Sequence, residues 1–151
     1  MKISKIELDN WMIFGGRQKV EFATGSENIT LIFGENMHGK TSLLNAIRWC
    51  LYGSAINRQG KGIPTKDLIN IPAQRRNESK VSVRLNFEVD GSKYELLREL
   101  EYSGNTPTMS KSLKIDGRVV DGGKIESEID IVLPEQISQF MLFDGELLTN
   151  F

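Results

Sequence analysis

Alternation of apolar and polar residues marks several segments of the chain as β-strands. Successive side chains of a strand point to opposite faces, so one apolar residue in every two indicates a half-buried strand. Asp90-Gly91 and Asp116-Gly117 each follow such a segment, and both dipeptides predict hairpin turns. The alternating segments are residues 2–8, 18–22, 80–89 and 94–100. We therefore expect antiparallel strands in the second half of the chain.

A change of period near residue 34 predicts a strand followed by a helix. Residues 29–33 (I-T-L-I-F) are apolar almost without a break, which is typical of a strand buried on both faces. Residues 40–52 then show helical spacing, and Gly53 suits a C-terminal cap. Leu43, Ala46, Ile47, Cys50 and Leu51 share the apolar face of that helix. Shorter helices are expected at 65–70, 123–133 and 136–139, the last opened by Pro134.

Composition narrows the class of protein. The chain has 151 residues, the size of one domain, and we treat 1–151 as a unit. The net charge is −1, so bulk charge does not indicate a nucleic-acid partner. The single cysteine excludes an intrachain disulfide and favours a reducing compartment. With no signal-peptide core and no run long enough to span a bilayer, we expect a cytoplasmic protein without a membrane partner.

Residues 34–41 (G-E-N-M-H-G-K-T) fit the phosphate-loop pattern G-x-x-x-x-G-K-[ST]. Glycines let backbone N–H groups approach phosphate, and the following helix turns its positive N-terminus toward the same oxygens. Lys40 is expected to reach the β- and γ-phosphates and Thr41 to bind Mg²⁺. The expected nucleotide-binding residues are Gly34, Glu35, Asn36, Met37, His38, Gly39, Lys40, Thr41 and Ser42. The alternative is a chance match in a glycine-rich turn.

His38 and Cys50 could each have a functional role, but we favour a simpler interpretation of both. His38 is a conceivable catalytic base, but inner-loop side chains usually point away from phosphate, and we expect only its backbone N–H to serve. Cys50 lies on the apolar face of the predicted helix, where core packing is the default role for a cysteine.

Four stretches of sequence resemble the SMC/SbcC/RecF branch of ABC-type ATPases, and most of all the DndD-like proteins of bacterial DNA phosphorothioation systems. They are I-S-K-I-E-L-D-N-W-M-I-F-G-G, N-I-T-L-I-F-G-E-N-M-H-G-K-T-S-L-L-N-A-I-R-W-C-L-Y-G, K-D-L-I-N and L-P-E-Q-I-S-Q-F-M-L-F-D-G-E. The resemblance implies an α/β P-loop NTPase fold, the N-terminal lobe of an ABC-type head. A mixed sheet would surround the phosphate-loop helix beside an antiparallel β-subdomain, which the two predicted hairpins fit. The implied cofactors are ATP and Mg²⁺.

The segment F-M-L-F-D-G-E near the end of the chain has more than one interpretation. The resemblance places Asp144 at the Q-loop position, where relatives carry a glutamine that joins Mg²⁺ and the attacking water. Asp144 can still reach a hydrated Mg²⁺, and Gln139 is a weaker substitute for the water-orienting role. Alternatively, the segment is a Walker B strand with Asp144 on Mg²⁺, or a plain turn. We favour the Q-loop.

A second departure from the family pattern occurs at N-W-M, where relatives often carry a basic residue near the nucleotide. Met12 cannot supply that charge. Arg17 and Lys19 are candidates, although a solvated strand end is the simpler interpretation of both.

The sequence contains neither an L-S-G-G signature nor an apolar run followed by Asp-Glu. In the family these elements follow a long coiled coil. We therefore expect an N-terminal lobe that is inactive alone and hydrolyses ATP only with the C-terminal lobe and a second head, as a homodimer. DNA and other modification or restriction subunits are the implied partners. Arg75, Arg76, Lys80 and Arg84 are candidate phosphate contacts, although solvent-facing roles are the default.

The function that the resemblance implies is that of an ATPase in DNA modification and restriction, with a role in phage defence. Three alternatives stay open. The first is an SbcC- or RecF-like DNA repair ATPase lobe. The second is a complete small P-loop kinase or GTPase with Asp144 as its Walker B residue, which would turn over nucleotide alone. The third is a binding module with a degenerate loop and no Mg²⁺-dependent affinity for nucleotide.

Overall fold

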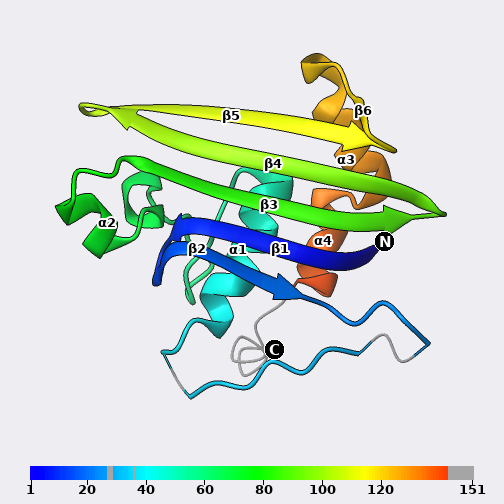
Figure 1. Ribbon diagram of the computed structural model, residues 1–151, viewed down its shortest axis with the longest axis horizontal. Helices are drawn as coiled ribbons and strands as arrows, with labels where there is room; N and C mark the ends of the chain where they lie inside the picture. Colours follow the sequence, from blue (N-terminus) through cyan, green and yellow to red (C-terminus); the bar gives the residue numbers. More distant parts are fainter. Residues whose placement is uncertain (27–28, 36, 143–151) are drawn as a thin grey trace.

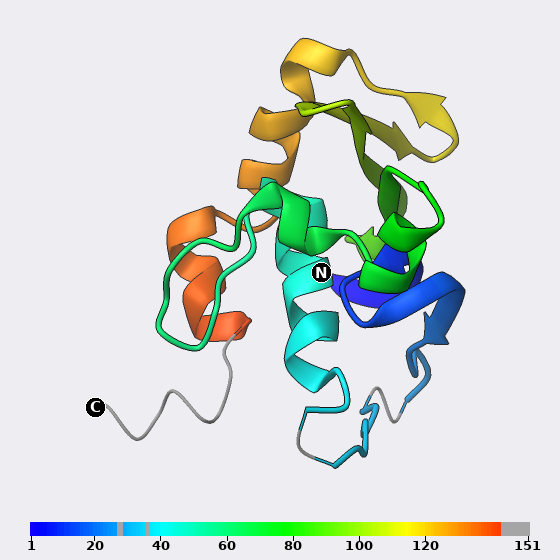
Figure 2. The same ribbon diagram turned by 90° about the vertical axis from the view of Figure 1, so that its left-hand side faces the viewer.

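Six strands form one antiparallel sheet, and helices lie on one of its faces (Figures 1 and 2). The computed structural model describes residues 1–26, 29–35 and 37–142. The strand order is β2-β1-β3-β4-β5-β6, and each neighbouring pair is antiparallel. The strands are β1 (Lys2–Trp11), β2 (Phe14–Glu21), β3 (Lys80–Val89), β4 (Ser92–Ser103), β5 (Thr106–Ile115) and β6 (Arg118–Val119). The alternating segments are confirmed as strands.

Both predicted hairpins are confirmed by the turns that close them. Asp90 and Gly91 join β3 to β4 with φ of 49° and 86°. Asp116 and Gly117 join β5 to β6 with φ of 50° and 80°. Two successive residues with positive φ match the right-handed twist of the paired strands, which is why Asp-Gly is favoured there.

The helices cover the inner face of the sheet, with α1 in the centre (Figure 2). They are α1 (Lys40–Tyr52), α2 (Ile71–Arg75), α3 (Ile125–Val132) and α4 (Glu135–Met141), with 3₁₀ turns η1 (Thr65–Leu68) and η2 (Gly122–Lys124). The prediction of a helix over 40–52 is confirmed, and Gly53 caps it with φ of 76° and a hydrogen bond to the carbonyl of Trp49. No helix in the described ranges has the length and apolar character that crossing a membrane requires.

The region around Pro72 differs from the prediction of one short helix over 65–70. A 3₁₀ turn ends at Leu68, and α2 then begins at Ile71 and contains Pro72. Proline is tolerated in the first helical turn because its missing N–H would have no partner there. Asn70 caps α2 by accepting a hydrogen bond from Ala73 N at 3.2 Å.

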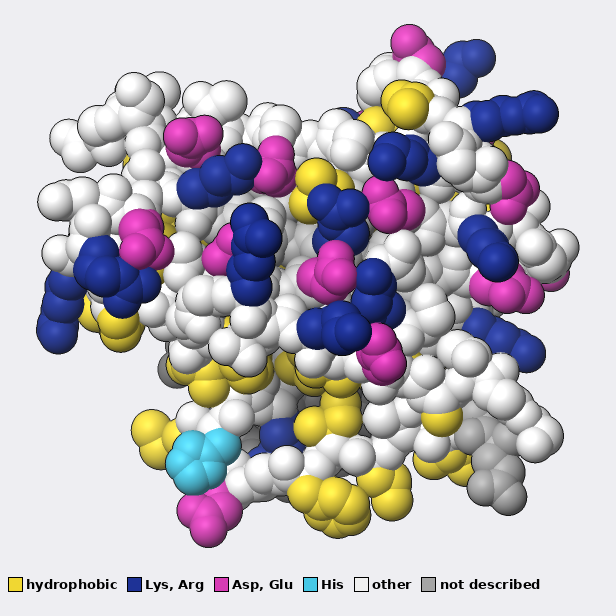
Figure 3. All heavy atoms as spheres, viewed as in Figure 1, with side chains coloured by type: hydrophobic (Ala, Val, Ile, Leu, Met, Phe, Trp, Pro, Cys, Tyr) yellow, Lys and Arg dark blue, Asp and Glu magenta, His cyan; other side chains and the backbone are white. Residues whose placement is uncertain are grey.

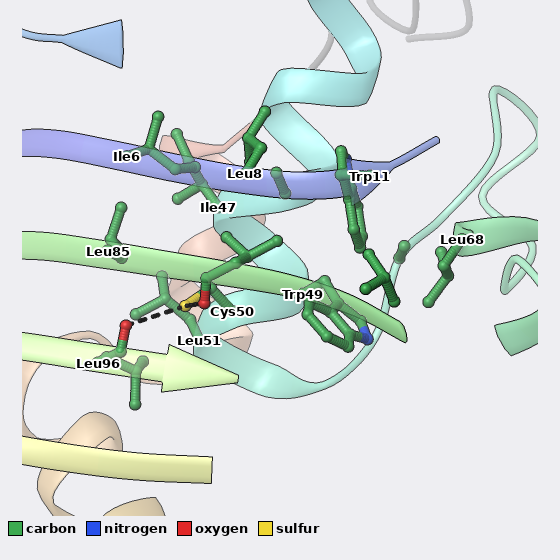
Figure 4. Packing of buried hydrophobic residues seen from close by; sticks show 14 of the residues in the cluster. Ile6, Leu8, Trp11, Ile47, Trp49, Cys50, Leu51, Leu68, Leu85 and Leu96 are labelled. Carbon is green, nitrogen blue, oxygen red and sulfur yellow. Dashed lines mark hydrogen bonds between the residues drawn. The ribbon is translucent and has the colours of Figure 1, made fainter. Parts of the chain in front are cut away.

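The hydrophobic core lies between α1 and the inner face of the sheet (Figure 4). The apolar face predicted for α1 is confirmed, since all five of its apolar residues are buried. Cys50 is completely buried, and its thiol donates to the carbonyls of Val83 and Leu96 at 3.4 and 3.6 Å. The role expected for this cysteine in core packing is therefore confirmed.

Burial raises the pKa of the Cys50 thiol from 9.0 to about 12. The unfolded chain ionises first, so the neutral thiol's contribution to stability is complete below pH 9 and is lost as pH rises toward about 12. We expect the free energy of unfolding to fall faster above pH 9 in the wild type than in Cys50→Ala, by up to roughly 1.4 kcal/mol per pH unit. Urea unfolding of both proteins across this range measures the difference, and parallel profiles would contradict it.

The prediction of a buried strand at residues 29–33 is wrong. These residues form no strand in the structure, and their large apolar side chains are exposed. The exposed fractions are 76% for Ile29, 73% for Leu31, 45% for Ile32 and 88% for Phe33. A strand needs neighbours for its N–H and C=O groups, and every described strand pairs within the antiparallel sheet instead. The α/β class is confirmed, while the mixed part of the expected sheet is not formed by the described residues.

Candidate nucleotide-binding site

The phosphate-loop segment leads directly into the N-terminus of α1. Gly39 is the N-cap residue with φ of 97°, and its carbonyl accepts the first helical hydrogen bond, from Leu43 N at 2.8 Å. Among the described residues no side chain caps this end of α1, and no acidic residue lies in its first turn. The N-terminal end of a helix carries a partial positive charge and unsatisfied amides. This end of α1 is therefore suited to an anion such as phosphate.

Lys40 curls back over the loop that precedes it. Its Nζ donates to the carbonyls of Gly34 and Glu35 at 2.5 and 2.9 Å. Exposed carbonyls hold an ammonium group loosely compared with the charged oxygens of phosphate. Lys40 can thus exchange these partners for phosphate, and Thr41 follows it on the first turn of α1. The phosphate and Mg²⁺ roles expected of these two residues remain predictions.

Residues 37–39 of the loop have a sharply turned backbone. Met37 has φ of 68°, so it adopts the left-handed conformation that glycine adopts at Gly39. His38 N donates to the carbonyl of Glu35 at 3.3 Å. Its imidazole is largely exposed, with Nδ1 at 3.8 Å from a Glu35 carboxylate oxygen. The backbone N–H of His38 would therefore have to leave the Glu35 carbonyl to bind phosphate, and the role expected of it remains a prediction.

Two side chains that the sequence reasoning missed hold α1 in place near the loop. Trp11 at the end of β1 donates its indole N–H to the carbonyl of Ser42 at 2.8 Å. Asn45, one turn further along α1, donates to the carbonyl of Ile56 and accepts from its N–H, at 2.8 and 3.0 Å. Asn45 lies opposite the apolar face predicted for this helix, so helical spacing gave no signal for its burial.

A methyl group at Gly39 would collide with the connection between β1 and β2. An added Cβ would lie 2.6 Å from Ile13 Cδ1 and 2.7 Å from Phe14 Cζ. We expect Gly39→Ala to lower the free energy of unfolding by about 1–2 kcal/mol, because alanine also disfavours the left-handed backbone, and to weaken nucleotide binding. Gly104→Ala is the control, since Gly104 has φ of +61° but nothing within 4 Å of an added Cβ. Equal losses of stability in the two variants, measured by urea unfolding, would contradict the steric argument.

The opposite end of α1 is held by a buried arginine. Arg98 is 6% exposed and donates to the carbonyls of Cys50 and Leu51 at 3.0 and 3.1 Å. Burial lowers the pKa of Arg98. The guanidinium satisfies carbonyls that the end of a helix leaves open, and its charge opposes the negative end of the helix dipole. In the sequence, Arg98 lies between Leu96 and Leu100 in an alternating strand, so its side chain points to the same inward face as theirs. That position was the sequence signal that Arg98 is buried.

The structure does not describe several of the predicted site residues. Asn36 and Asp144 lie outside the described residues, as does the side chain of Gln139, whose backbone belongs to α4. The metal and catalytic roles expected of Asp144 and Gln139 therefore remain predictions.

The basic candidates on β2 are engaged with carboxylates. Arg17 lies 3.4 Å from Asp9 and is 92% exposed, while Lys19 lies 2.7 Å from Glu21. Met12 packs against the core cluster. These positions agree with the solvated strand end that we considered the simpler interpretation of Arg17 and Lys19.

The candidate DNA contacts do not gather into a basic patch. Figure 3 shows basic and acidic side chains interspersed over the open face of the sheet. Three of the four candidates have carboxylate partners: Arg76 with Glu78 at 2.7 Å, Lys80 with Glu99 at 2.8 Å, and Arg84 with Glu95 at 3.2 Å and Glu7 at 3.5 Å. The charges on this face therefore support the default expectation, that these basic residues face solvent, better than they support DNA binding.

Comparison with known proteins gives matches over nearly the whole chain. Residues 5–150 match a family described as "AAA domain". The DNA double-strand break repair Rad50 ATPase of Thermoplasma volcanium is 28% identical over 123 residues, which cover 82% of this chain and 12% of that protein. The chromosome partition protein Smc of Synechocystis is 31% identical over 130 residues, 83% of this chain and 10% of that protein. The SbcC component of the SbcCD nuclease of Vibrio cholerae is 30% identical over 100 residues, 66% of this chain and 9% of that protein. The chain thus spans roughly a tenth of the length of these relatives.

Proposed function

This chain belongs to the AAA-domain family, as an ATPase lobe of the SMC, Rad50 and SbcC type, and from that premise we propose that it binds Mg²⁺-ATP as one half of an ATPase head that acts on DNA. Lys40 would bind the β- and γ-phosphates, and Thr41 would bind Mg²⁺. Bound Mg²⁺ would neutralise phosphate charge, while this chain's backbone amides orient the nucleotide.

The observation that carries this proposal is the geometry of the phosphate loop. The loop adopts left-handed conformations at Met37 and Gly39, Lys40 folds back over it, and it ends at an uncapped helix N-terminus. A chance match in a glycine-rich turn gives no reason for the lysine to fold back over the loop. The geometry therefore supports nucleotide binding over the interpretation as a degenerate binding module.

The exposed apolar segment before the loop supports the need for a second lobe. Residues 29–33 carry the composition of a buried strand, yet four of their side chains are exposed. Figure 3 shows hydrophobic side chains at the surface in the lower part of the view, near the single histidine. We propose that the C-terminal lobe of the complete protein supplies the strands that cover this segment. A complete small kinase or GTPase would need a parallel sheet here, and the described strands are all antiparallel.

The pathway is the finer part of the proposal. We propose a DndD-like role in DNA phosphorothioation, with restriction and phage defence as the outcome and other modification or restriction subunits as partners. Its support is the resemblance of residues 133–146 (L-P-E-Q-I-S-Q-F-M-L-F-D-G-E) to that group. A second candidate is a DNA repair ATPase, which the names of the Rad50 and SbcC relatives favour. Loss of phosphorothioate linkages in cells that lack the protein would decide for the first, and repair-specific sensitivity for the second.

Binding and turnover of Mg²⁺-ATP test the biochemical proposal. We expect the chain to bind Mg²⁺-ATP without hydrolysing it, and turnover to begin when the C-terminal lobe is added. The signature and Walker B groups that stabilise the transition state are absent from this sequence. Robust turnover by the chain alone would contradict the split-head proposal and favour Asp144 as a Walker B residue in a complete enzyme.

A further inference from the structure

Two side chains of α1 hold the segment that contains α4 at both of its ends. Arg48 donates from Nη2 to the carbonyl of Leu142, the C-cap residue of α4, at 2.5 Å. Tyr52 donates its hydroxyl to the carbonyl of Leu133, two residues before α4 begins, at 2.8 Å. Residues four apart lie on the same face of a helix, so Arg48 and Tyr52 act from one side of α1. We call these two contacts the α1–α4 clamp.

Apolar packing does little to fix α4 in position. Of its described side chains only Ser138 is buried, while Ile137, Phe140 and Met141 are 49%, 73% and 67% exposed. Leu142 at the C-cap joins the core cluster with 8% exposure. The Ser138 hydroxyl is satisfied locally by the carbonyl of Glu135 at 2.7 Å. The two hydrogen bonds of the clamp, together with Leu142 in the core, therefore attach α4 to the rest of the lobe.

The clamp starts from the helix that carries the phosphate site. Thr41 and Arg48 are separated by seven positions along α1, which is about 10 Å in an α-helix. Both residues line the same small recess of about 20 Å³, together with Asn45 and Asn57. Asp144, the predicted Q-loop residue, follows Leu142 by two positions in the sequence. Arg48 thus links α1, which begins at the phosphate loop, with Leu142, which precedes Asp144 in the sequence.

We infer that Arg48 is a positioning residue, which together with Tyr52 makes α4 respond to nucleotide bound at the other end of α1. The inference rests on the proposed function for its nucleotide, and it assigns to Arg48 no contact with the nucleotide itself. A bound nucleotide restrains the first turn of α1, and a rigid helix carries that restraint to Arg48 and Tyr52. The clamp then passes it to α4.

Hydrogen exchange of the protein without nucleotide tests the clamp itself. We expect Arg48→Met to speed exchange of the α4 amides by roughly tenfold or more, because a hydrogen bond to a charged donor is lost from a weakly packed element. Tyr52→Phe removes only a hydroxyl, keeps the ring, and is expected to speed the same amides by a smaller factor. Amides of α1 should be unchanged in both, which shows that the variants are folded. Arg118→Met, at an exposed position on β6, is the matched control. Unchanged α4 exchange in Arg48→Met would overturn the inference.

Hydrogen exchange measured in the presence of Mg²⁺-ATP tests the coupling between the nucleotide and α4. A purely structural role of Arg48 would not produce such coupling. We expect nucleotide to slow exchange of α4 in the wild type, and Arg48→Met to lose this response while its ATP affinity stays within about twofold. Slowed α1 amides without any slowing of α4 in the wild type would overturn the coupling. If the wild type binds no nucleotide, the proposed function and the coupling both fail, while the clamp itself is still judged by the nucleotide-free comparison.

Discussion

Replacement of Lys40 by alanine is expected to weaken Mg²⁺-ATP binding by about 100-fold or more. The ammonium would make charge-assisted hydrogen bonds to phosphate, each worth roughly 1.5–3 kcal/mol, and every 1.4 kcal/mol changes affinity about tenfold. The folded chain should tolerate the change, because the described hydrogen bonds of Lys40 Nζ join it to the carbonyls of Gly34 and Glu35 at an exposed loop. Isothermal titration calorimetry gives the affinity, and urea unfolding gives the stability.

Lys93→Ala is the matched control for that experiment. Lys93 is an exposed lysine near the start of β4, and its loss removes the same charge from the protein at a position away from the loop. Its nucleotide affinity should equal that of the wild type. Equal affinities of Lys40→Ala and the wild type would remove the basis for a phosphate site at residues 34–41.

Trp11→Ala is expected to have the largest effect on stability, lowering the free energy of unfolding by about 3–5 kcal/mol. Trp11 is completely buried, and its ring centre lies 5.1 Å from that of Trp49. Alanine leaves a cavity at the end of β1 and removes the hydrogen bond to the carbonyl of Ser42. The free energy of unfolding of a typical domain is only about 5–15 kcal/mol, so the variant should be close to unfolding. Urea unfolding followed by far-UV circular dichroism measures the loss.

The two tryptophans also give an internal comparison. Trp49 is as deeply buried as Trp11, but its indole N–H meets no acceptor among the residues that the structure describes. Phenylalanine at either position removes a similar volume, whereas only Trp11→Phe also removes a hydrogen bond. We expect Trp11→Phe to be the more destabilising by about 1 kcal/mol. A larger loss for Trp49→Phe would contradict the role assigned to the Trp11–Ser42 contact.

Local patterns predicted the strands and α1 well, because the signals for these elements are short in range. The alternation over 80–89 and the Asp90-Gly91 turn specify a hairpin without reference to distant residues. Helical spacing from Lys40, with Gly53 behind it, likewise specifies both ends of α1. The phosphate-loop motif is likewise local, and the nucleotide-binding roles that it predicts remain predictions.

The errors and omissions concern residues whose state depends on distant partners. Residues 29–33 have the composition of a buried strand, but a strand also needs neighbours, and none of the described strands pairs with it. Arg48 resembles an ordinary surface charge until the fold places the carbonyl of Leu142 beside it, and the inward position of Arg98 does not show that it meets carbonyls of α1. Sequence spacing alone does not show which carbonyl a guanidinium will meet.

The pairing of β1 with β3 has a consequence for the order of folding. Ile6 opposes Leu85 across this pair, so the phosphate loop and α1 lie within a long excursion of chain between two neighbouring strands. The β1–β2 hairpin and the hairpins of β3, β4 and β5 close short loops and can form within microseconds, whereas β1 must still find β3 far along the chain. During synthesis from the N-terminus, β1 therefore waits for β3 to emerge. We expect the nucleotide site to be among the last parts of the lobe to mature, and the apolar side of α1 to need protection from aggregation until then.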